Sequence, residues 1–230
     1  MRNALALTIV VLAGSLSATW ALTVPIFQAT DEAAHFDYAM TIFSAGRLIA
    51  TPGRTTAWIA SPYTRYLLGA TDYFRLAFHS SMRVPAGYGT LAYYRRIDAG
   101  APSLTAAAND GGPISFIAPA YPFGFYALEA LWMKLAAALT HSLVATFFAA
   151  RLLCVLLMMI GLYFSYRTAL NVGISPWLCV ALVAIAGFFP LTTLVSSYVQ
   201  PDNLAFALVA ASLFLSTQLR RSRRPALTTL

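Results

Sequence analysis

Five long runs of apolar residues divide the chain, each near the ~20 residues that a helix needs to cross a bilayer. Four of them predict membrane-spanning helices, at residues 4–24, 143–168, 174–196 and 201–219. The fifth run, residues 114–139, contains prolines and a glycine and then Glu129 and Lys134. Because each of these two charges is costly at mid-bilayer, this run predicts an interfacial or re-entrant helix instead of a fifth span.

A more polar stretch, residues 25–113, separates the first span from the interfacial helix. Its many tyrosines and phenylalanines provide aromatic surface that can fold against the membrane, so it predicts an extracytoplasmic loop with short juxtamembrane helices. Within it, the residues from Thr30 to Ala45 include no proline or glycine. They predict a helix with Thr30 as its N-cap and Gly46 just beyond its C-terminus.

Composition supports an all-α integral membrane protein with a single membrane domain over residues 1–230. The chain is 59% hydrophobic and 10% charged, against ~45–50% apolar and ~25% charged residues in soluble domains. Its formal net charge is +7, and a basic tail at residues 220–230 carries several arginines. The positive-inside rule places this tail in the cytoplasm, and four spans then place the N-terminus there too. The basic residues are not interleaved with aromatic ones, so nucleic acid is not an expected partner.

The candidate chemistry lies just after the first span, in "PIFQATDEAAHFDYA", which contains Asp31, Glu32 and His35. One interpretation is structural: acids in the first turn complement the helix dipole, which is worth ~0.3–1 kcal/mol each. The other is functional. Helical spacing puts Asp31 and His35 on one face while Glu32 points about 100° away, so one acid can face a site while its neighbour braces arginines of the loop. The two interpretations can both hold.

Three motifs together carry a resemblance. They lie in "PIFQATDEAAHFDYA", in "APAYPFGFYALEAL" and in "SSYVQPDNLAFAL". Their order and their sidedness resemble GT-C-type membrane glycosyltransferases and a related family of bacterial multi-pass membrane proteins with a first-loop P-x-D-E-x-x-H-F motif. The chain then resembles the N-terminal part of a GT-C-like module. The matching residues are Asp31, Glu32, His35, Phe36, Pro119, Pro122, Tyr126, Asp202 and Asn203.

The resemblance implies transfer of a sugar from a polyprenyl-phosphate donor to an extracytoplasmic acceptor hydroxyl, in envelope glycan or glycolipid synthesis. The location it implies is the bacterial cytoplasmic (inner) membrane, with the active face outside. By this resemblance Asp31 is the general base, and Glu32 and Asp202 are further catalytic carboxylates that orient the acceptor. A divalent ion, magnesium or manganese, is a further expectation at Asp31 and Glu32. Because Asp202 is predicted on the same side of the membrane as Asp31, we expect the two to share one site.

A second set of residues is expected to bind substrate. The leaving phosphate needs cations. Arg151 is a candidate because it lies at membrane depth, where a charge is a functional hypothesis. Arg47 is the other candidate, with a role at a helix C-terminus as its alternative. The full predicted set is His35, Arg47, Tyr121, Tyr126, Arg151 and Asn203.

Other classes of function stay open. The chain is shorter than GT-C enzymes usually are, so it is expected to be either a truncated form or half of a split enzyme. In the second case a second membrane chain that completes the module is an expected partner, besides the donor and membrane lipids. A non-catalytic subunit or binding module of an envelope polysaccharide assembly or export system is one alternative. A transporter is another.

The predicted topology can be tested by cysteine accessibility. A cysteine introduced after Arg224 should be protected from impermeant external reagents, whereas one near Gly87 should be labelled, because the charge asymmetry requires an even number of spans. Labelling of both positions in intact cells would show that residues 114–139 cross the membrane.

Overall fold

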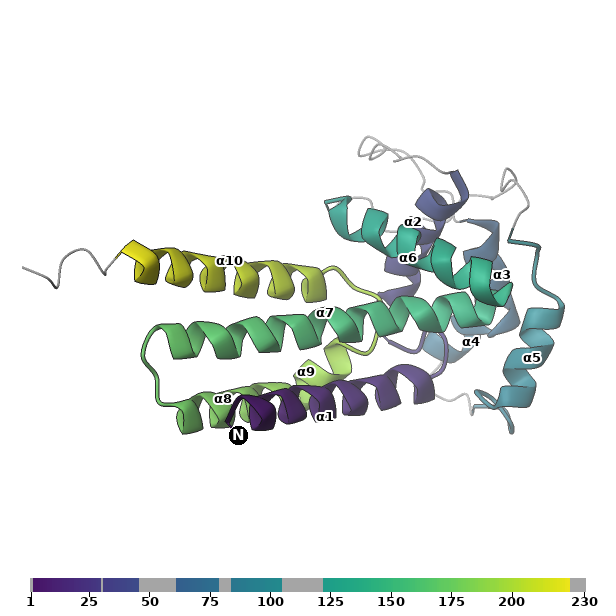
Figure 1. Ribbon diagram of the computed structural model, residues 1–230. Coiled ribbons are helices and arrows are strands. Elements are labelled where there is room, and N and C mark those ends of the chain that lie inside the picture. Colours follow the sequence, from purple (N-terminus) through teal and green to yellow (C-terminus); the bar gives the residue numbers. More distant parts are fainter. Residues whose placement is uncertain (1, 30, 46–60, 79–83, 105–121, 224–230) are drawn as a thin grey trace, which may run out of the picture. The chain divides into compact units, whose positions relative to one another are not determined.

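A computed structural model describes residues 2–29, 31–45, 61–78, 84–104 and 122–223. Every regular element in these ranges is a helix, and they contain no strand (Figure 1). The predicted all-α class is therefore confirmed for this part of the chain. Two compact units are present. Unit 1 comprises Met1–Ala21, Cys154–Ser197 and Pro201–Leu230, and unit 2 comprises Leu22–Leu153 and Tyr198–Gln200.

Unit 1 contains helices from the start of the chain and from its second half. They are α1 (Arg2–Thr23), the later part of α7 (Leu143–Asn171), α8 (Pro176–Phe188), α9 (Pro190–Val195) and α10 (Asp202–Arg223). Among the described residues, three helical segments are long and apolar enough to cross a membrane: Asn3–Thr23, Leu143–Asn171 and Asp202–Ser222. Helix α8 is apolar but shorter. The fourth predicted span therefore stays a prediction.

Residues 174–196 form two helices because of one proline. Ser175 starts α8 as its N-cap, with its hydroxyl accepting the N–H of Leu178 at 3.4 Å. The helix stops at Phe188, and Phe189 has an extended backbone with φ −62° and ψ 125°. A residue before proline is disfavoured in the α region, so Pro190 forces this break and becomes the first residue of α9.

The core of unit 1 forms where α1, α7 and α8 pack together. Its buried side chains include Val10, Leu162 and Val183. Small residues allow close approach: a Cβ added at Gly187 would lie 3.0 Å from the Ala13 side chain. Close helix packing through such small residues is typical of helices in membranes.

Unit 2 contains the helices of the predicted loop and those that follow it, up to the first part of one long helix; that the loop helices lie against the membrane stays a prediction. The helices of unit 2 are α2 (Glu32–Ala45), α3 (Pro62–Ala70), α4 (Tyr73–Phe78), α5 (Leu91–Ala99), α6 (Gly124–Thr140) and the first part of α7. Helix α2 extends to Ala45, the last residue described before a gap, and the predicted end at Gly46 lies outside the described residues. Helix α6 packs against α2, with the rings of Tyr38 and Tyr126 4.4 Å apart between centroids.

The start of α7 is fixed by an acid from α5. Asp98 accepts the backbone N–H of Val144 at 3.0 Å and also the hydroxyl of Ser142. The N–H of Val144 is one of the backbone donors at a helix N-terminus that lack partners within the helix. The N-terminal end of α7, a helix of 29 residues, is therefore anchored to α5 of unit 2. This part of α7 carries Arg151 into the site described next.

Candidate functional site

The first acid of the motif, Asp31, adopts an uncommon backbone conformation. Its φ is +58°, in the left-handed region, where non-glycine residues are uncommon and aspartate is among those enriched. Its carbonyl accepts the N–H groups of Ala34 at 3.0 Å and His35 at 3.2 Å, so α2 starts directly after it. The Asp31 side chain is exposed, and no donor within the described ranges hydrogen-bonds its carboxylate. Thr30, the predicted N-cap, lies outside those ranges.

The second acid, Glu32, is fully buried in an ion pair with Arg151 of α7. The Nε of Arg151 donates to one carboxylate oxygen at 2.7 Å and Nη2 donates to the other at 2.7 Å. Both side chains are 0% exposed. The backbone N–H of Val199, also in unit 2, donates to Glu32 at 3.2 Å. Such a bidentate, charge-assisted pair is among the stronger polar contacts a protein can make.

The remaining donors of Arg151 bind the turn that follows α1. Nη2 donates to the Pro25 carbonyl at 2.9 Å, and Nη1 donates to the Val24 carbonyl. The ring of Phe147 lies under the guanidinium, 4.7 Å from its centroid to the Arg151 Cζ. Arg151 thus contacts the turn, the start of α2 and its own helix at once. Its predicted binding of a substrate phosphate stays a prediction, and would require these bonds to be exchanged.

His35 and Tyr126, both predicted to bind substrate, do contact each other. His35 Nδ1 and the Tyr126 hydroxyl are 2.8 Å apart, and the two rings are stacked with an interplanar angle of 19°. The contact joins α2 to α6 in the buried part of unit 2. Hydrogen-bonding to a neighbouring side chain is therefore an observed role of His35.

Tyr73, at the start of α4, is a site residue that the sequence did not single out. Burial raises the pKa of its hydroxyl, and the negative charges of Asp31 and Glu32 raise that pKa further. Its ring also packs edge-on against Phe27, 6.0 Å away between centroids. The only signal in the sequence is that Tyr73 belongs to the aromatic-rich loop, which gives no position relative to the two acids.

Glu129 of α6 is buried, and neither carboxylate oxygen has a hydrogen-bond partner among the described residues. It lies on the buried face of α6 that also carries Tyr126 and Met133. Burial raises the pKa of its carboxyl well above the usual 4.5, because an apolar environment disfavours the charged form. The sequence indicated that a charge at this position of an apolar run is costly. It did not indicate that Glu129 would lack a hydrogen-bond partner among the described residues.

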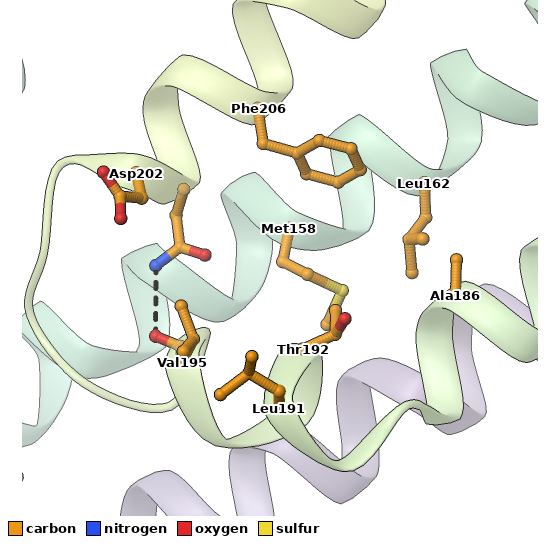
Figure 2. A pocket seen from close by; sticks show the side chains of 9 residues that line it. Met158, Leu162, Ala186, Leu191, Thr192, Val195, Asp202 and Phe206 are labelled. Atoms are coloured by element: carbon orange, nitrogen blue, oxygen red, sulfur yellow. Dashed lines mark hydrogen bonds between the residues drawn. The ribbon is translucent and has the colours of Figure 1, made fainter.

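Asp202 and Asn203 belong to unit 1. Asp202 is the first residue of α10 and is exposed, while Asn203 is buried and donates from Nδ2 to the Val195 carbonyl at 3.5 Å. Both line a cavity of about 440 Å³ (Figure 2). Because Asp31 is in unit 2 and Asp202 in unit 1, the predicted shared site of the two carboxylates stays a prediction.

The other predicted residues can be placed only in part. Arg47 and Tyr121 lie outside the described residues. In the part of the chain that the structure describes, no group of three His, Cys, Asp or Glu is arranged to hold a metal. Both oxygens of Glu32 are taken by Arg151, and a hard cation needs several such oxygens without a guanidinium beside them. The carboxylates of Asp31 and Glu32, as they lie in the structure, therefore do not fit a divalent ion.

Comparison with known proteins gives one family-level result. A family model described as a predicted membrane protein (DUF2142) matches residues 15–230. No curated protein matches the chain significantly. No solved structure does so either.

The Glu32–Arg151 pair should be essential for stability. Glu32→Gln leaves a buried guanidinium without its counter-charge and should lower the free energy of unfolding by about 3–5 kcal/mol, whereas replacing both residues by methionine should cost less. The matched control is Arg75→Gln, since the side chains of Arg75 and Asp72 are 62% and 51% exposed and loss of this pair should change stability by about 0.5 kcal/mol or less. Unfolding in detergent micelles measures all three; equal stability of Glu32→Gln and Arg75→Gln would contradict the assignment.

Glu129 should make unit 2 less stable as the pH rises. The pKa of Glu129 is raised in the folded state. The contribution of its protonated carboxyl to the free energy of unfolding is therefore complete below about pH 4.5 and is lost progressively as the pH rises toward the folded-state pKa. Glu129→Gln should therefore be more stable than the wild type at about pH 8, and this advantage should shrink toward about pH 4. Melting temperatures of both proteins across this range test the sign; parallel curves would show that the carboxyl has a partner in the folded protein.

Proposed function

The chain belongs to the DUF2142 family of predicted membrane proteins, and we propose that it is a membrane glycosyltransferase-like protein. In this proposal it transfers a sugar from a polyprenyl-phosphate donor to an acceptor hydroxyl at the outer face of a bacterial inner membrane. The transfer serves envelope glycan or glycolipid synthesis. Asp31 is the general base.

The observation that carries the proposal is the division of roles between the two adjacent acids. Glu32 is buried against Arg151, whereas the Asp31 carboxylate is exposed and has no hydrogen-bond donor among the described residues. A general base needs an ionised group that the substrate can reach. A left-handed backbone at Asp31 adds support, since strained conformations of non-glycine residues cluster at functional sites.

The proposed reaction is a displacement at the anomeric carbon of the donor sugar. Asp31 accepts the proton of the acceptor hydroxyl. The hydroxyl oxygen bonds to the anomeric carbon while the bond from that carbon to the phosphate oxygen breaks. The leaving group is the polyprenyl phosphate, whose charge needs a cation. Arg47 is the proposed cation, while Arg151 positions Asp31 by holding the adjacent Glu32. No step uses a metal ion.

Asp31→Asn tests the proposal with little change to the fold. Asparagine also tolerates a left-handed backbone, so expression and membrane insertion should be unchanged. Loss of a general base should lower the rate by ~10²–10⁴-fold. The measurement is transfer of labelled sugar from polyprenyl-phosphate donors in membranes that contain the chain and any partner chain encoded beside it.

Asp72→Asn provides a closely matched control. Asp72 also has a left-handed backbone, with φ +52°, and is exposed. Its carbonyl accepts the N–H of Leu76 at 3.0 Å at the start of α4, as that of Asp31 does at the start of α2. Activity of Asp72→Asn should equal that of the wild type. Equal activity of Asp31→Asn and Asp72→Asn would instead favour a non-catalytic subunit of an envelope assembly system.

A further inference from the structure

One end of unit 1 brings together the ends of three helices. The hydroxyl of Tyr166, near the end of α7, donates to Asn3 Oδ1 at the start of α1 at 2.9 Å. Asn171, the last residue of α7, donates from Nδ2 to the hydroxyl of Thr217, in the last part of α10, at 3.0 Å. The start of α1, the end of α7 and the last turns of α10 therefore lie next to one another.

The charge of unit 1 is concentrated at these helix ends. The unit contains one aspartate or glutamate, Asp202, at the first turn of α10. Arg221 lies near the other end of that helix, about 28 Å away along its axis at ~1.5 Å per residue. In the sequence, all arginines of the unit are at these helix ends or within a few residues of them: Arg2, Arg167, Arg220, Arg221, Arg223 and Arg224. Unit 1 thus supplies no acidic side chain near its arginines.

Two of these arginines lie along the contact between α7 and α10. The Arg167 Cζ is 5.5 Å from the centroid of the Phe214 ring, so a cation of α7 packs on an aromatic ring of α10. In the other direction, Arg221 of α10 donates from Nη1 to Asn171 Oδ1 of α7 at 3.1 Å. Asn171 follows Arg167 by one helical turn and lies on the same face of α7. These contacts place both guanidiniums beside the same helix pair.

Each of the two guanidiniums has donors to spare. A guanidinium carries five N–H donors. Arg167 donates to the Tyr163 hydroxyl at 2.8 Å and Arg221 to Asn171, and both side chains make these bonds at the surface. Neither arginine forms an ion pair with an acid of the described residues. The planar fork of donors on arginine matches the oxygens of a phosphate.

Exposed apolar residues lead along both helices to an arginine. In α7 they occupy one face and reach Arg167 at i, i+4, i+7 and i+11 spacing, and in α10 they share a face with Arg220. These residues are Leu156, Ile160 and Tyr163 in α7, and Val209 and Leu213 in α10. Because α7 and α10 are candidate membrane spans, a molecule that covers this surface and its arginines needs an apolar chain and an anionic end. A phospholipid has both, whereas a free phosphate has only the second.

We propose that Arg167 and Arg221 together bind the phosphate of an anionic phospholipid, with an acyl chain of the lipid along the exposed apolar face of α7. A headgroup with a net negative charge is preferred over a zwitterionic one, because unit 1 offers no acidic side chain near the arginines to pair with an ammonium group. Clusters of basic residues at the ends of membrane spans are typical of sites for anionic lipids. The site is independent of the proposed role of Asp31, because all of its residues belong to unit 1.

Lipid titrations of the purified full chain, followed by native mass spectrometry from detergent, test the site. The probes are phosphatidylglycerol, which is anionic, and phosphatidylcholine with the same acyl chains, which is neutral overall. The wild type should bind phosphatidylglycerol about tenfold more tightly than phosphatidylcholine. Replacing both arginines, Arg167→Gln with Arg221→Gln, should lower the affinity for phosphatidylglycerol about tenfold and leave that for phosphatidylcholine unchanged. Glycerol 3-phosphate at the same concentration should not compete.

The matched control removes two other exposed arginines of the chain. Arg95→Gln with Arg96→Gln makes the same change of charge on α5, in unit 2, and should lower the affinity for phosphatidylglycerol less than twofold. The melting temperature of each double variant in phosphatidylcholine-containing micelles reports whether it folds. If the first pair does not fold, the single variants Arg167→Gln and Arg221→Gln replace it, with a loss of about threefold expected for each.

Three results would overturn the proposal. Equal losses of affinity in the two double variants would show that phosphatidylglycerol responds only to the overall charge of the chain. Equal affinities of the wild type for the two lipids would remove the preference for an anionic headgroup. Competition by glycerol 3-phosphate would show that the arginines bind a phosphate without its acyl chains.

Discussion

Unit 2 depends on one desolvated pair of opposite charges. Glu32 and Arg151 are separated by 119 residues in the sequence, yet both are fully buried and bonded through two parallel hydrogen bonds. Taking either charge out of water alone costs several kcal/mol, so the protein must supply every remaining partner. It does so with backbone groups: carbonyls of Val24 and Pro25 for the arginine, and the N–H of Val199 for the glutamate. Four separate stretches of chain are fixed as a result.

The same pair gives the two adjacent acids at the start of α2 different environments. A single carboxylate could not both neutralise a buried guanidinium and stay accessible. The left-handed backbone at Asp31 turns the chain just before the helix, so Glu32 is inside while Asp31 is exposed. Aromatic rings close around the buried partner: Phe147 packs against both Phe27 and Phe36, with centroid distances of 5.2 and 5.0 Å. The division of labour thus follows from burial and backbone conformation together.

Local rules predicted much of the fold and part of the site. The apolar runs indicated the helical membrane class, and the absence of proline and glycine up to Ala45 indicated a helix through the residues that α2 occupies. Helical spacing predicted that Glu32 would point away from Asp31 and that one of the two acids would brace arginines of the loop. Instead, Asp31 lies before the first residue of α2, and the arginine that Glu32 binds, Arg151, is in α7. No local rule selects Arg151 as that arginine, because the contact depends on how α7 packs in three dimensions. The sequence assigned Arg151 to a substrate phosphate, since a charge at membrane depth looks the same in either role.

Other details escaped sequence reasoning for similar reasons. The pairing of His35 with Tyr126 requires α6 to pack on α2, which periodicity does not specify. Pro190 was visible in the sequence, but hydropathy averaged over a window of residues does not register a single helix break. Glu129 has no hydrogen-bond partner among the described residues because no donor lies close enough to its carboxylate, and this depends on how the helices pack. Each of these is a property of tertiary packing.

The break at Phe189 also bears on the thickness of the membrane around the protein. Helix α8 has 13 residues, so at ~1.5 Å per residue it is about 20 Å long, roughly 10 Å less than the hydrocarbon core of a bilayer. Helix α9 has 6 residues and adds about 9 Å only to the extent that the two axes align. If residues 174–196 cross the membrane as predicted, a segment this short is subject to hydrophobic mismatch, which thins the adjacent bilayer or draws other helices against it. Lipids with shorter chains should then be enriched beside α8.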